Sequence, residues 1–374
     1  MDKIPLNWVC WGNNSGYSQA AQDLILALEL SGKYDVRVQF IYEKLVQRKG
    51  MTDERWEFFQ KLCKKPKNEN SIQVYHCIPS AQRHVPRLKK TIGFATFETF
   101  DPPNEGNLGW INILNRNDAI ITPSDFNFRI FAHEKLKKPL FKVPHVFDQK
   151  LFNPEVEPLE EHSRFTFLFF GAWRVRKGYQ ELIEAWCREF TAQDNVQLII
   201  KTDKTQKAKT VIQKIKNNLG YLLKDIAPIL FENKVFDELT LPRFLKSAHC
   251  LISPTRGEGF GLPGLQCMAL DVPVAITDFS GCQDYANDET CTLIKPAGFV
   301  LHPCMDNLPQ FRNKKWASIE TREVCRVLRH VYENMEDVKR KAKMAVPFVQ
   351  NKFGYDNAVS AFSEIMRETY GIKS

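Results

Sequence analysis

Short apolar runs alternate with polar or helix-patterned stretches along this chain, and the alternation occurs as two successive series. The first series has apolar runs at residues 7–11, 36–42, 72–77, 91–97, 118–124 and 141–145. The second has apolar runs at residues 165–171, 196–201, 249–253 and 272–277, with helix-patterned stretches at 179–190 and 242–248. Such alternation is typical of parallel sheets whose strands are joined by crossover helices. The sequence therefore predicts an α/β protein with two doubly wound parallel-sheet domains.

The boundary between the two series lies near residues 153–163, where the sequence NPEVEPLEEHS has the composition of a linker. The 374 residues also exceed what a single hydrophobic core usually supports. From Ile319 onward the pattern is helical, and it ends with a helix-patterned stretch at 355–370. Two domains followed by a helical tail are expected.

A glycine-rich loop lies between two strand-like runs of the second series. HCLIS (249–253) and VPVAIT (272–277) read as buried parallel strands, and glycines occupy positions 257, 259 and 261 between them. Glycines let the backbone approach a ligand closely, and Pro263 suits the first turn of a helix. Amide N–H groups at such a helix start attract an anion, most often phosphate. Two further glycine segments, 12–18 and 171–178, follow the first strand of each series, where sheets of this class bind ligands.

Composition restricts the cellular setting and the partners. No apolar run approaches the roughly 20 residues of a membrane span, and the N-terminus lacks the apolar core of a signal peptide. The ten cysteines form no CxxC pair, which favours buried thiols in a reducing compartment, so we expect a cytoplasmic protein. The formal net charge is +8, with basic segments at 64–70, 83–90 and 201–216. This charge fits a solvated basic surface with a nucleotide-phosphate site, or a surface for nucleic acid or for an anionic membrane.

Longer segments carry a family resemblance across almost the whole chain. They are FGAWRVRKGYQELIEAWCREF (170–190), LIIKT (198–202), SPTRGEGFGLPGLQCMA (253–269) and VAITDFSGCQDY (274–285), with GYSQAAQDL (16–24), FETFDPP (97–103), ITPSDFNFRIFAHEK (121–135) and VPHVFDQKLFNP (143–154) in the first half. In this order they resemble the retaining glycosyltransferases of family 4, the glycosyl transferases group 1. The resemblance implies the GT-B fold, in which two Rossmann-like domains face each other across a cleft. It assigns residues 1–155 to an acceptor-binding domain, 156–350 to a nucleotide-sugar-binding domain, and 351–374 to a helix that returns to the N-terminal domain.

The family signature is a pair of glutamates separated by seven residues. Glu258 matches the first, which lies close to the transferred sugar in the family and can stabilise the positive charge that develops there. The bland alternative is a loop carboxylate that accepts bonds from backbone N–H groups. Gln266 stands at the second position, where it can hydrogen-bond the ribose hydroxyls without the charge of a carboxylate.

The resemblance also implies the residues that hold the diphosphate. Lys177, with Arg174 or Arg176, would neutralise the leaving group, and a basic surface turn is the alternative for each. The remaining donor-side candidates are backbone N–H groups in the glycine loop and two side chains near the nucleotide: Gly259, Phe260, Gly261, Leu262, Lys201 and Phe236. Core packing explains Phe236 equally well.

Four residues of the first half are candidates for the acceptor side. Gly16 and Tyr17 follow the first strand, and Glu98 and His145 end later strands. A single histidine after an apolar run is more often structural than catalytic. No His, Asp or Cys cluster has metal-ligand spacing, and the resemblance implies an enzyme that works without a metal or other cofactor.

The resemblance thus implies a retaining, metal-independent glycosyltransferase that moves a sugar from a UDP- or GDP-sugar to a hydroxyl of a glycan, a lipid-linked molecule or another acceptor. Three alternatives stay open: a sugar-nucleotide 2-epimerase, a non-catalytic sugar-nucleotide-binding module, and a glycosyltransferase that modifies nucleic acid. Peripheral association with an anionic membrane is a further expectation that the charge leaves open.

Overall fold

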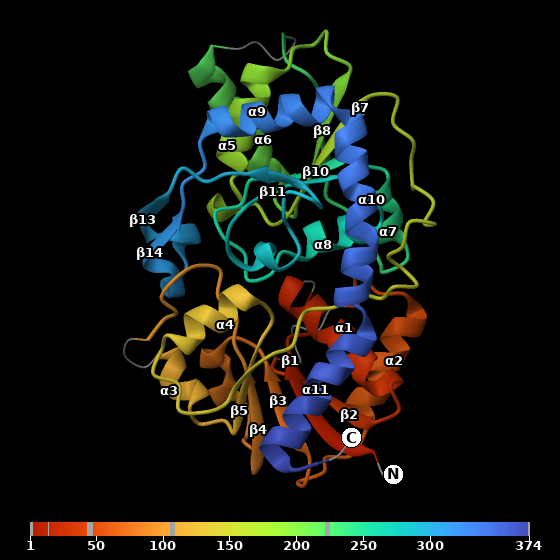
Figure 1. Ribbon diagram of the computed structural model, residues 1–374, viewed down its shortest axis with the longest axis vertical. Helices are drawn as coiled ribbons and strands as arrows, with labels where there is room; N and C mark the ends of the chain where they lie inside the picture. The colour runs from red at the N-terminus through yellow and green to blue at the C-terminus, as the bar shows by residue number, and fades with distance from the viewer. Residues whose placement is uncertain (1–2, 14, 43–47, 105–108, 221–224, 373–374) are drawn as a thin grey trace. The chain divides into compact units, whose positions relative to one another are not determined.

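The computed structural model describes residues 3–13, 15–42, 48–104, 109–220 and 225–372. The chain forms two compact units (Figure 1). Unit 1 contains Met1–Gln149, Phe236–Glu238 and Asn351–Ser374, and unit 2 contains Lys150–Val235 and Leu239–Gln350. Within the described part of the chain, no helix combines the length and the apolar character needed to cross a lipid bilayer.

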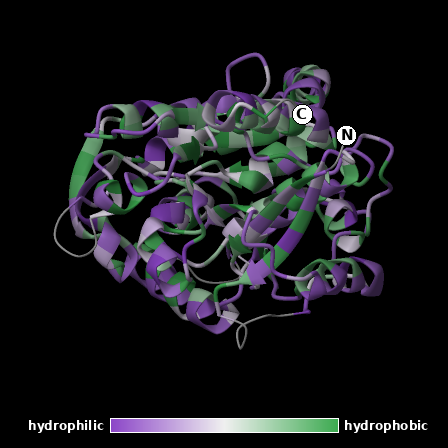
Figure 2. Ribbon diagram, turned by 90° about the horizontal axis from the view of Figure 1, so that it is seen from below, coloured by the Kyte–Doolittle hydropathy of each residue, from purple (hydrophilic) through white to green (hydrophobic). Residues whose placement is uncertain are grey.

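Unit 1 is built on a parallel sheet with strand order β2-β1-β3-β4-β5-β6, referred to below as sheet A. Its strands are β1 (Ile4–Cys10), β2 (Tyr34–Phe40), β3 (Ile72–His76), β4 (Lys90–Phe94), β5 (Ala119–Thr122) and β6 (Leu140–Lys142). Its helices before the tail are α1 (Gly16–Leu30), α2 (Asp53–Lys64), α3 (Trp110–Leu114) and α4 (Asp125–Ala132). The central strands are buried along their length, as expected when helices cover both faces of a parallel sheet. Figure 2 shows hydrophobic colour on the strands and hydrophilic colour on many outward-facing turns.

The last helix, α11 (Tyr355–Tyr370), belongs to unit 1 although it ends the chain. Phe362 on α11 lies 5.8 Å from the ring of Trp8 and 5.5 Å from the ring of Tyr34. The hydroxyl of Tyr34 also lies 2.9 Å from that of Ser363. The helical tail therefore contributes core residues to the N-terminal sheet.

Unit 2 is built on a second parallel sheet, sheet B, with strand order β12-β11-β10-β7-β8-β9. Its strands are β7 (Phe165–Phe170), β8 (Val196–Lys201), β9 (Ile229–Glu232), β10 (Cys250–Ser253), β11 (Val274–Thr277) and β12 (Thr292–Ile294). Its helices are α5 (Tyr179–Glu189), α6 (Thr205–Leu219), α7 (Thr240–Lys246), α8 (Leu262–Ala269), α9 (Thr321–Glu333) and α10 (Met335–Lys352). A separate antiparallel hairpin joins β13 (Phe299–Cys304) to β14 (Arg312–Ala317).

These two sheets confirm the α/β prediction of two doubly wound parallel-sheet domains. Every strand expected from an apolar run is present, although β6 is shorter than expected. None of the ten cysteines, all of which lie in the described residues, forms a disulfide, and Cys10, Cys77, Cys187, Cys250, Cys267, Cys282 and Cys291 are buried.

Candidate functional site

Two loops meet at the carboxyl edge of sheet B because their strands are neighbours. β7 pairs with β10, and the chain leaves them as the loops 171–178 and 254–261. At the meeting point Gly178 adopts a φ of +71°, and a Cβ atom there would lie only 1.8 Å from the carbonyl oxygen of Pro254. Only glycine fits this approach. The sequence thus brings the basic loop and the glycine loop together.

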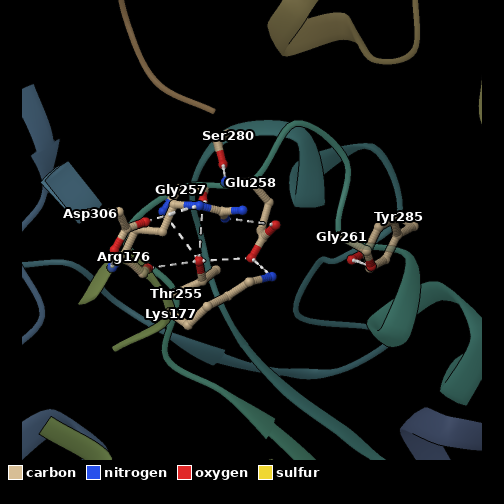
Figure 3. A network of polar contacts seen from close by, with 9 residues as sticks. All are labelled: Arg176, Lys177, Thr255, Gly257, Glu258, Gly261, Ser280, Tyr285 and Asp306. Carbon is tan, nitrogen blue, oxygen red and sulfur yellow. Dashed lines mark hydrogen bonds and ion pairs between the residues drawn. The ribbon is translucent and has the colours of Figure 1, made fainter. Parts of the chain in front are cut away.

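Glu258 is buried where these loops meet (Figure 3). Its Oε1 lies 2.5 Å from Lys177 Nζ and accepts a hydrogen bond from Thr255 Oγ1 at 3.1 Å. Its Oε2 lies 3.2 Å from Arg176 Nη1. Burial alone would raise the pKa of this carboxyl, but the adjacent Lys177 and Arg176 outweigh burial and lower the pKa to about 2. Glu258 is therefore a carboxylate at neutral pH.

Arg176 is held between two carboxylates. Besides Glu258, its Nε lies 3.5 Å from Asp306 Oδ2, and its backbone N–H donates to Asp306 Oδ1 at 3.3 Å. Its Nη1 also donates to the carbonyl oxygen of Gly257 at 3.1 Å. Arg174 differs, because its guanidinium makes no hydrogen bond or ion pair with any other described residue. Of the two arginines, Arg176 is built into the site and Arg174 is free to meet a ligand.

The glycine loop is fixed by close contacts before helix α8 begins. Gly261 precedes α8 with a φ of +88°, and its carbonyl oxygen accepts a hydrogen bond from the Tyr285 hydroxyl at 2.6 Å. The backbone N–H of Glu258 donates to Ser280 Oγ at 2.8 Å. The N–H groups of Gly261 and Leu262 donate to no acceptor within the described residues. They remain available to an anion at the start of α8.

The other donor-side candidates lie in several environments. Gln266 is buried on α8, where its amide makes no hydrogen bond to another described side chain or backbone group. Lys201 ends β8, with Nζ donating to the carbonyl oxygen of Lys234 and lying 5.4 Å from the centre of the Phe170 ring. Phe260 is buried, with its ring 5.8 Å from that of Tyr285. Phe236 belongs to unit 1, whereas the other donor-side candidates belong to unit 2.

The four acceptor-side candidates all lie in unit 1. Gly16 opens α1, and a Cβ atom there would meet nothing within 4 Å. The Tyr17 ring lies 6.4 Å from that of Phe94, and the His145 ring stacks on Phe94 at 5.5 Å. Burial raises the pKa of Tyr17 well above its usual value, with Glu98 adding to the effect, and burial lowers the pKa of His145 to about 3. Both side chains are therefore neutral at physiological pH, and His145 is a buried member of an aromatic stack.

Three polar contributors to the unit 2 site were not among the sequence candidates. Thr255 and Ser280 lie inside segments that carry the family resemblance, 253–269 and 274–285. Their place in these segments could have identified them as candidates. Asp306 gave none, because it lies in the connection between β13 and β14, 48 residues after Glu258 in sequence. In the described residues, no group of three or more His, Cys, Asp or Glu side chains is arranged to hold a metal ion.

The comparisons with known proteins match this architecture. Residues 164–301 match the family model of the glycosyl transferases group 1, a span that includes Lys177, Glu258 and Gln266. An uncharacterized glycosyltransferase of Methanocaldococcus jannaschii is 29% identical over 170 residues, which is 43% of this chain and 40% of that protein. The chain thus spans less than half the length of the curated relatives it matches.

Solved structures match over nearly the whole chain. The structure of HepE from Anabaena in complex with UDP and glucose has a TM-score of 0.70 at 12% identity, and the match covers 98% of this chain and 100% of that one. Sucrose-phosphate synthase from Thermosynechococcus elongatus has a TM-score of 0.68 at 13% identity, covering 99% and 100%. Two parallel six-stranded sheets with this similarity have the GT-B fold, and residues 164–301 match the model of a glycosyl transferases group 1 domain.

Proposed function

We propose that this protein is a retaining glycosyltransferase of the family 4 type, which transfers a sugar from a nucleotide-diphosphate sugar to an acceptor hydroxyl. One observation carries the proposal: an ionised, buried Glu258 lies between Lys177 and Arg176 beside a glycine loop that opens a helix. The group 1 domain match, which covers all these residues, supports it.

The proposed reaction uses these charges at the bond that breaks. The bond between the anomeric carbon and the diphosphate oxygen breaks, and its electron pair stays on the diphosphate. Lys177, Arg176 and the free guanidinium of Arg174 would stabilise that negative charge together with the N–H groups of Gly261 and Leu262. These side chains supply the positive charge that a divalent cation would otherwise provide.

Glu258 would act on the sugar itself. Positive charge develops on the ring as the diphosphate leaves, and a carboxylate held ionised by its neighbours can stabilise it or hydrogen-bond a sugar hydroxyl. The acceptor hydroxyl would attack on the face that the diphosphate leaves, and a leaving-group oxygen would take its proton. This route retains the anomeric configuration and requires no side-chain nucleophile.

A UDP-sugar is the proposed donor class. HepE has been crystallised with UDP-glucose, and the fold of that structure matches 98% of the present chain. Gln266 would offer neutral hydrogen bonds to the ribose hydroxyls from the buried face of α8.

A thermal-shift panel of UDP-, GDP- and ADP-glucose tests the proposal. A ligand that binds only the folded protein stabilises it and so raises its melting temperature. At a ligand concentration a hundredfold above Kd, the free energy of unfolding rises by about 2.7 kcal/mol. We expect UDP-glucose to raise the melting temperature of the wild type but not of Lys177→Ala, each compared with its own ligand-free baseline. Lys204→Ala, at an exposed lysine of the same unit, is the matched control and should respond like the wild type. No shift with any of the three sugar nucleotides would refute the donor assignment.

A further inference from the structure

One edge of sheet A collects the amino ends of all six of its strands. The strands are parallel, so the stretches that lead into them lie side by side along that edge, here named the amino edge. Its stretches are residue 3 and residues 31–33, 64–71, 85–90, 115–118 and 133–139. Adjacent strands are spaced about 4.8 Å apart, so six strands give an edge about 24 Å wide.

Every one of these stretches contains at least one basic side chain. Twelve are lysine or arginine and only three are acidic. The twelve are Lys3, Lys33, Lys64, Lys65, Lys67, Arg87, Lys89, Lys90, Arg116, Lys135, Lys137 and Lys138, of which all but the half-buried Lys65 and Lys138 are exposed. Each of the six stretches thus contributes at least one exposed positive charge to the amino edge.

Little of this charge is neutralised locally. Lys65 pairs with Glu29 and Asp35, and Lys67 pairs with Glu69. The other ten make no ion pair with a described residue. The remaining two acidic groups have other partners: Asp118 accepts from the Thr91 N–H at 2.8 Å, and Glu134 accepts from Asn104 Nδ2 at 3.2 Å.

The opposite edge of the same sheet carries no such excess. Among described residues, the loops that follow the six strands contain Arg48, Lys49 and Arg83 against Glu98, Asp101 and Asp148. The positive charge of unit 1 is therefore concentrated at one end of its strands, and such an asymmetry orients a protein in an external electric field.

We propose that the amino edge docks unit 1 on an anionic lipid surface. Ten of the twelve cations are lysines, which act as point charges, whereas arginine is the residue suited to paired recognition of individual phosphates. The six stretches contain no Phe, Tyr or Trp on which a nucleic-acid base could stack. Leu30, with 66% of its surface exposed, lies three residues before Lys33 and offers an apolar contact at the same edge. A broad row of lysines fits the diffuse negative charge of a bilayer.

This orientation has a consequence for the chemistry. Tyr17, Glu98 and His145 follow the carboxyl ends of their strands, so the lipid-bound edge lies at the far end of the sheet from them. The carboxyl edge of sheet A then faces the aqueous phase while the amino edge holds the protein at the surface.

Vesicle flotation with the full chain tests the proposal, using phosphatidylcholine vesicles with and without phosphatidylglycerol. The edge variant is Lys33→Gln, Lys89→Gln and Lys137→Gln combined, with one lysine ahead of each of β2, β4 and β6. The control variant is Lys204→Gln, Lys207→Gln and Lys214→Gln combined, which removes the same charge from exposed, unpaired lysines at α6 in unit 2. Melting temperatures should match those of the wild type in both variants, because none of the six side chains is buried or paired.

We expect the wild type to float only with the anionic vesicles, and added salt to weaken its binding. A lysine near an anionic surface contributes about fivefold in affinity, so the edge variant should lose on the order of 100-fold while the control keeps most of its binding. A wild type that does not float with anionic vesicles would overturn the proposal, as would equal losses in the two variants. Tighter binding to duplex DNA than to anionic vesicles at the same salt concentration would also overturn it.

Discussion

Glu258 shows how neighbouring charges can decide the form of a buried group. Its carboxyl is removed from water, which by itself favours the protonated form. Lys177 and Arg176 reverse that preference at 2.5 Å and 3.2 Å. The residue is therefore suited to stabilise positive charge and unsuited to donate a proton.

Replacement of Glu258 by Gln should lower the transfer rate by roughly 100- to 1,000-fold, the usual cost of losing one electrostatic contact to a transition state. Because its pKa is about 2, Glu258 stays ionised from about pH 5 to about pH 9, so the ratio of wild-type to variant rates should stay constant over that range. Initial rates of nucleotide release measured across this range check both points. Glu160→Gln, at a largely exposed glutamate, is the control. A ratio that changes tenfold per pH unit would show that Glu258 titrates in the working range.

Asp306 occupies a backbone conformation that few residues tolerate. Its φ is 56°, in the left-handed region that asparagine and aspartate enter more readily than other side chains. Its side chain is only 1% exposed and faces Arg176. The hairpin connection thus brings a buried negative charge to the arginine of the site.

A double-mutant cycle on Arg176 and Asp306 should reveal their coupling. Arg176→Gln alone leaves two buried carboxylates with fewer cations and should lower the free energy of unfolding by about 3 kcal/mol. Asp306→Asn removes one of those charges, and asparagine still tolerates the left-handed backbone conformation of this position. The free energy of unfolding of the double variant should therefore exceed the value expected from adding the two single effects by at least about 1 kcal/mol. Urea unfolding of the four proteins measures the cycle. Additive effects would mean that Asp306 does not act on Arg176.

At the level of the elements, the long buried strands were predictable, and the strands that were missed are short or exposed. VAIT at 274–277 and AIIT at 119–122 are apolar and fully buried, so their composition reflects the layer they occupy. β9 lies at a sheet edge with Leu230 exposed, and β12 has three residues, so neither produces a long apolar run. The hairpin β13–β14 carries Phe299, Val300 and Leu301 exposed, which breaks the expected relation between apolar character and burial.

Some residues of the candidate site could be predicted from the sequence, and Asp306 could not. Lys177, Glu258 and the glycines lie in two loops whose strands are adjacent, so the order of elements was enough to bring them together. Asp306 comes from the hairpin connection, and neither periodicity nor motif spacing connects it with Arg176. A contact between irregular segments depends on packing, which a local pattern does not contain.

Gly178 and Gly220 provide a matched test of what holds the site loop in place. Both adopt a φ near +72° beside a helix, but a Cβ atom at Gly178 would lie 1.8 Å from Pro254 O, whereas one at Gly220 would meet nothing within 4 Å. Gly220→Ala should cost about 1 kcal/mol of unfolding free energy from backbone strain alone. Gly178→Ala should cost at least about 3 kcal/mol, because the glycine loop must also move. Urea unfolding and UDP-glucose thermal shifts measure both effects. Similar losses in the two variants would mean that the contact with Pro254 does not hold the loops together.

At the scale of the whole molecule, the two units bury different titratable groups. Unit 1 buries His76 and His145, whose rings stack 5.9 Å apart. Burial lowers the pKa of both, to about 3 for His145, and the neighbouring His145 lowers the pKa of His76 further. Unit 2 buries the ionised Glu258, whose contribution is lost only between about pH 4.5 and about pH 2. As the pH is lowered, the buried histidines of unit 1 should therefore reduce stability at a higher pH than the loss of the charge on Glu258 in unit 2 does.

The free energy of unfolding should fall as the pH is lowered below about 6.5, the ordinary pKa of histidine. Below that pH the unfolded chain binds a proton at each histidine while the folded chain does not, so each buried histidine contributes a slope of up to about 1.4 kcal/mol per pH unit. His76→Phe should remove the contribution of one histidine to this slope. Both His76 ring nitrogens are buried without a hydrogen-bond partner in the described residues, and the ring already stacks on Phe94 at 4.0 Å. Urea unfolding from about pH 7 to about pH 5 measures the slope, and His84→Phe at an exposed histidine is the control that should leave it unchanged. Overpacking by the larger ring can shift the stability of His76→Phe at every pH, but it cannot restore the lost slope. Equal slopes in His76→Phe and the wild type would therefore show that His76 binds a proton in the folded protein as it does in the unfolded chain.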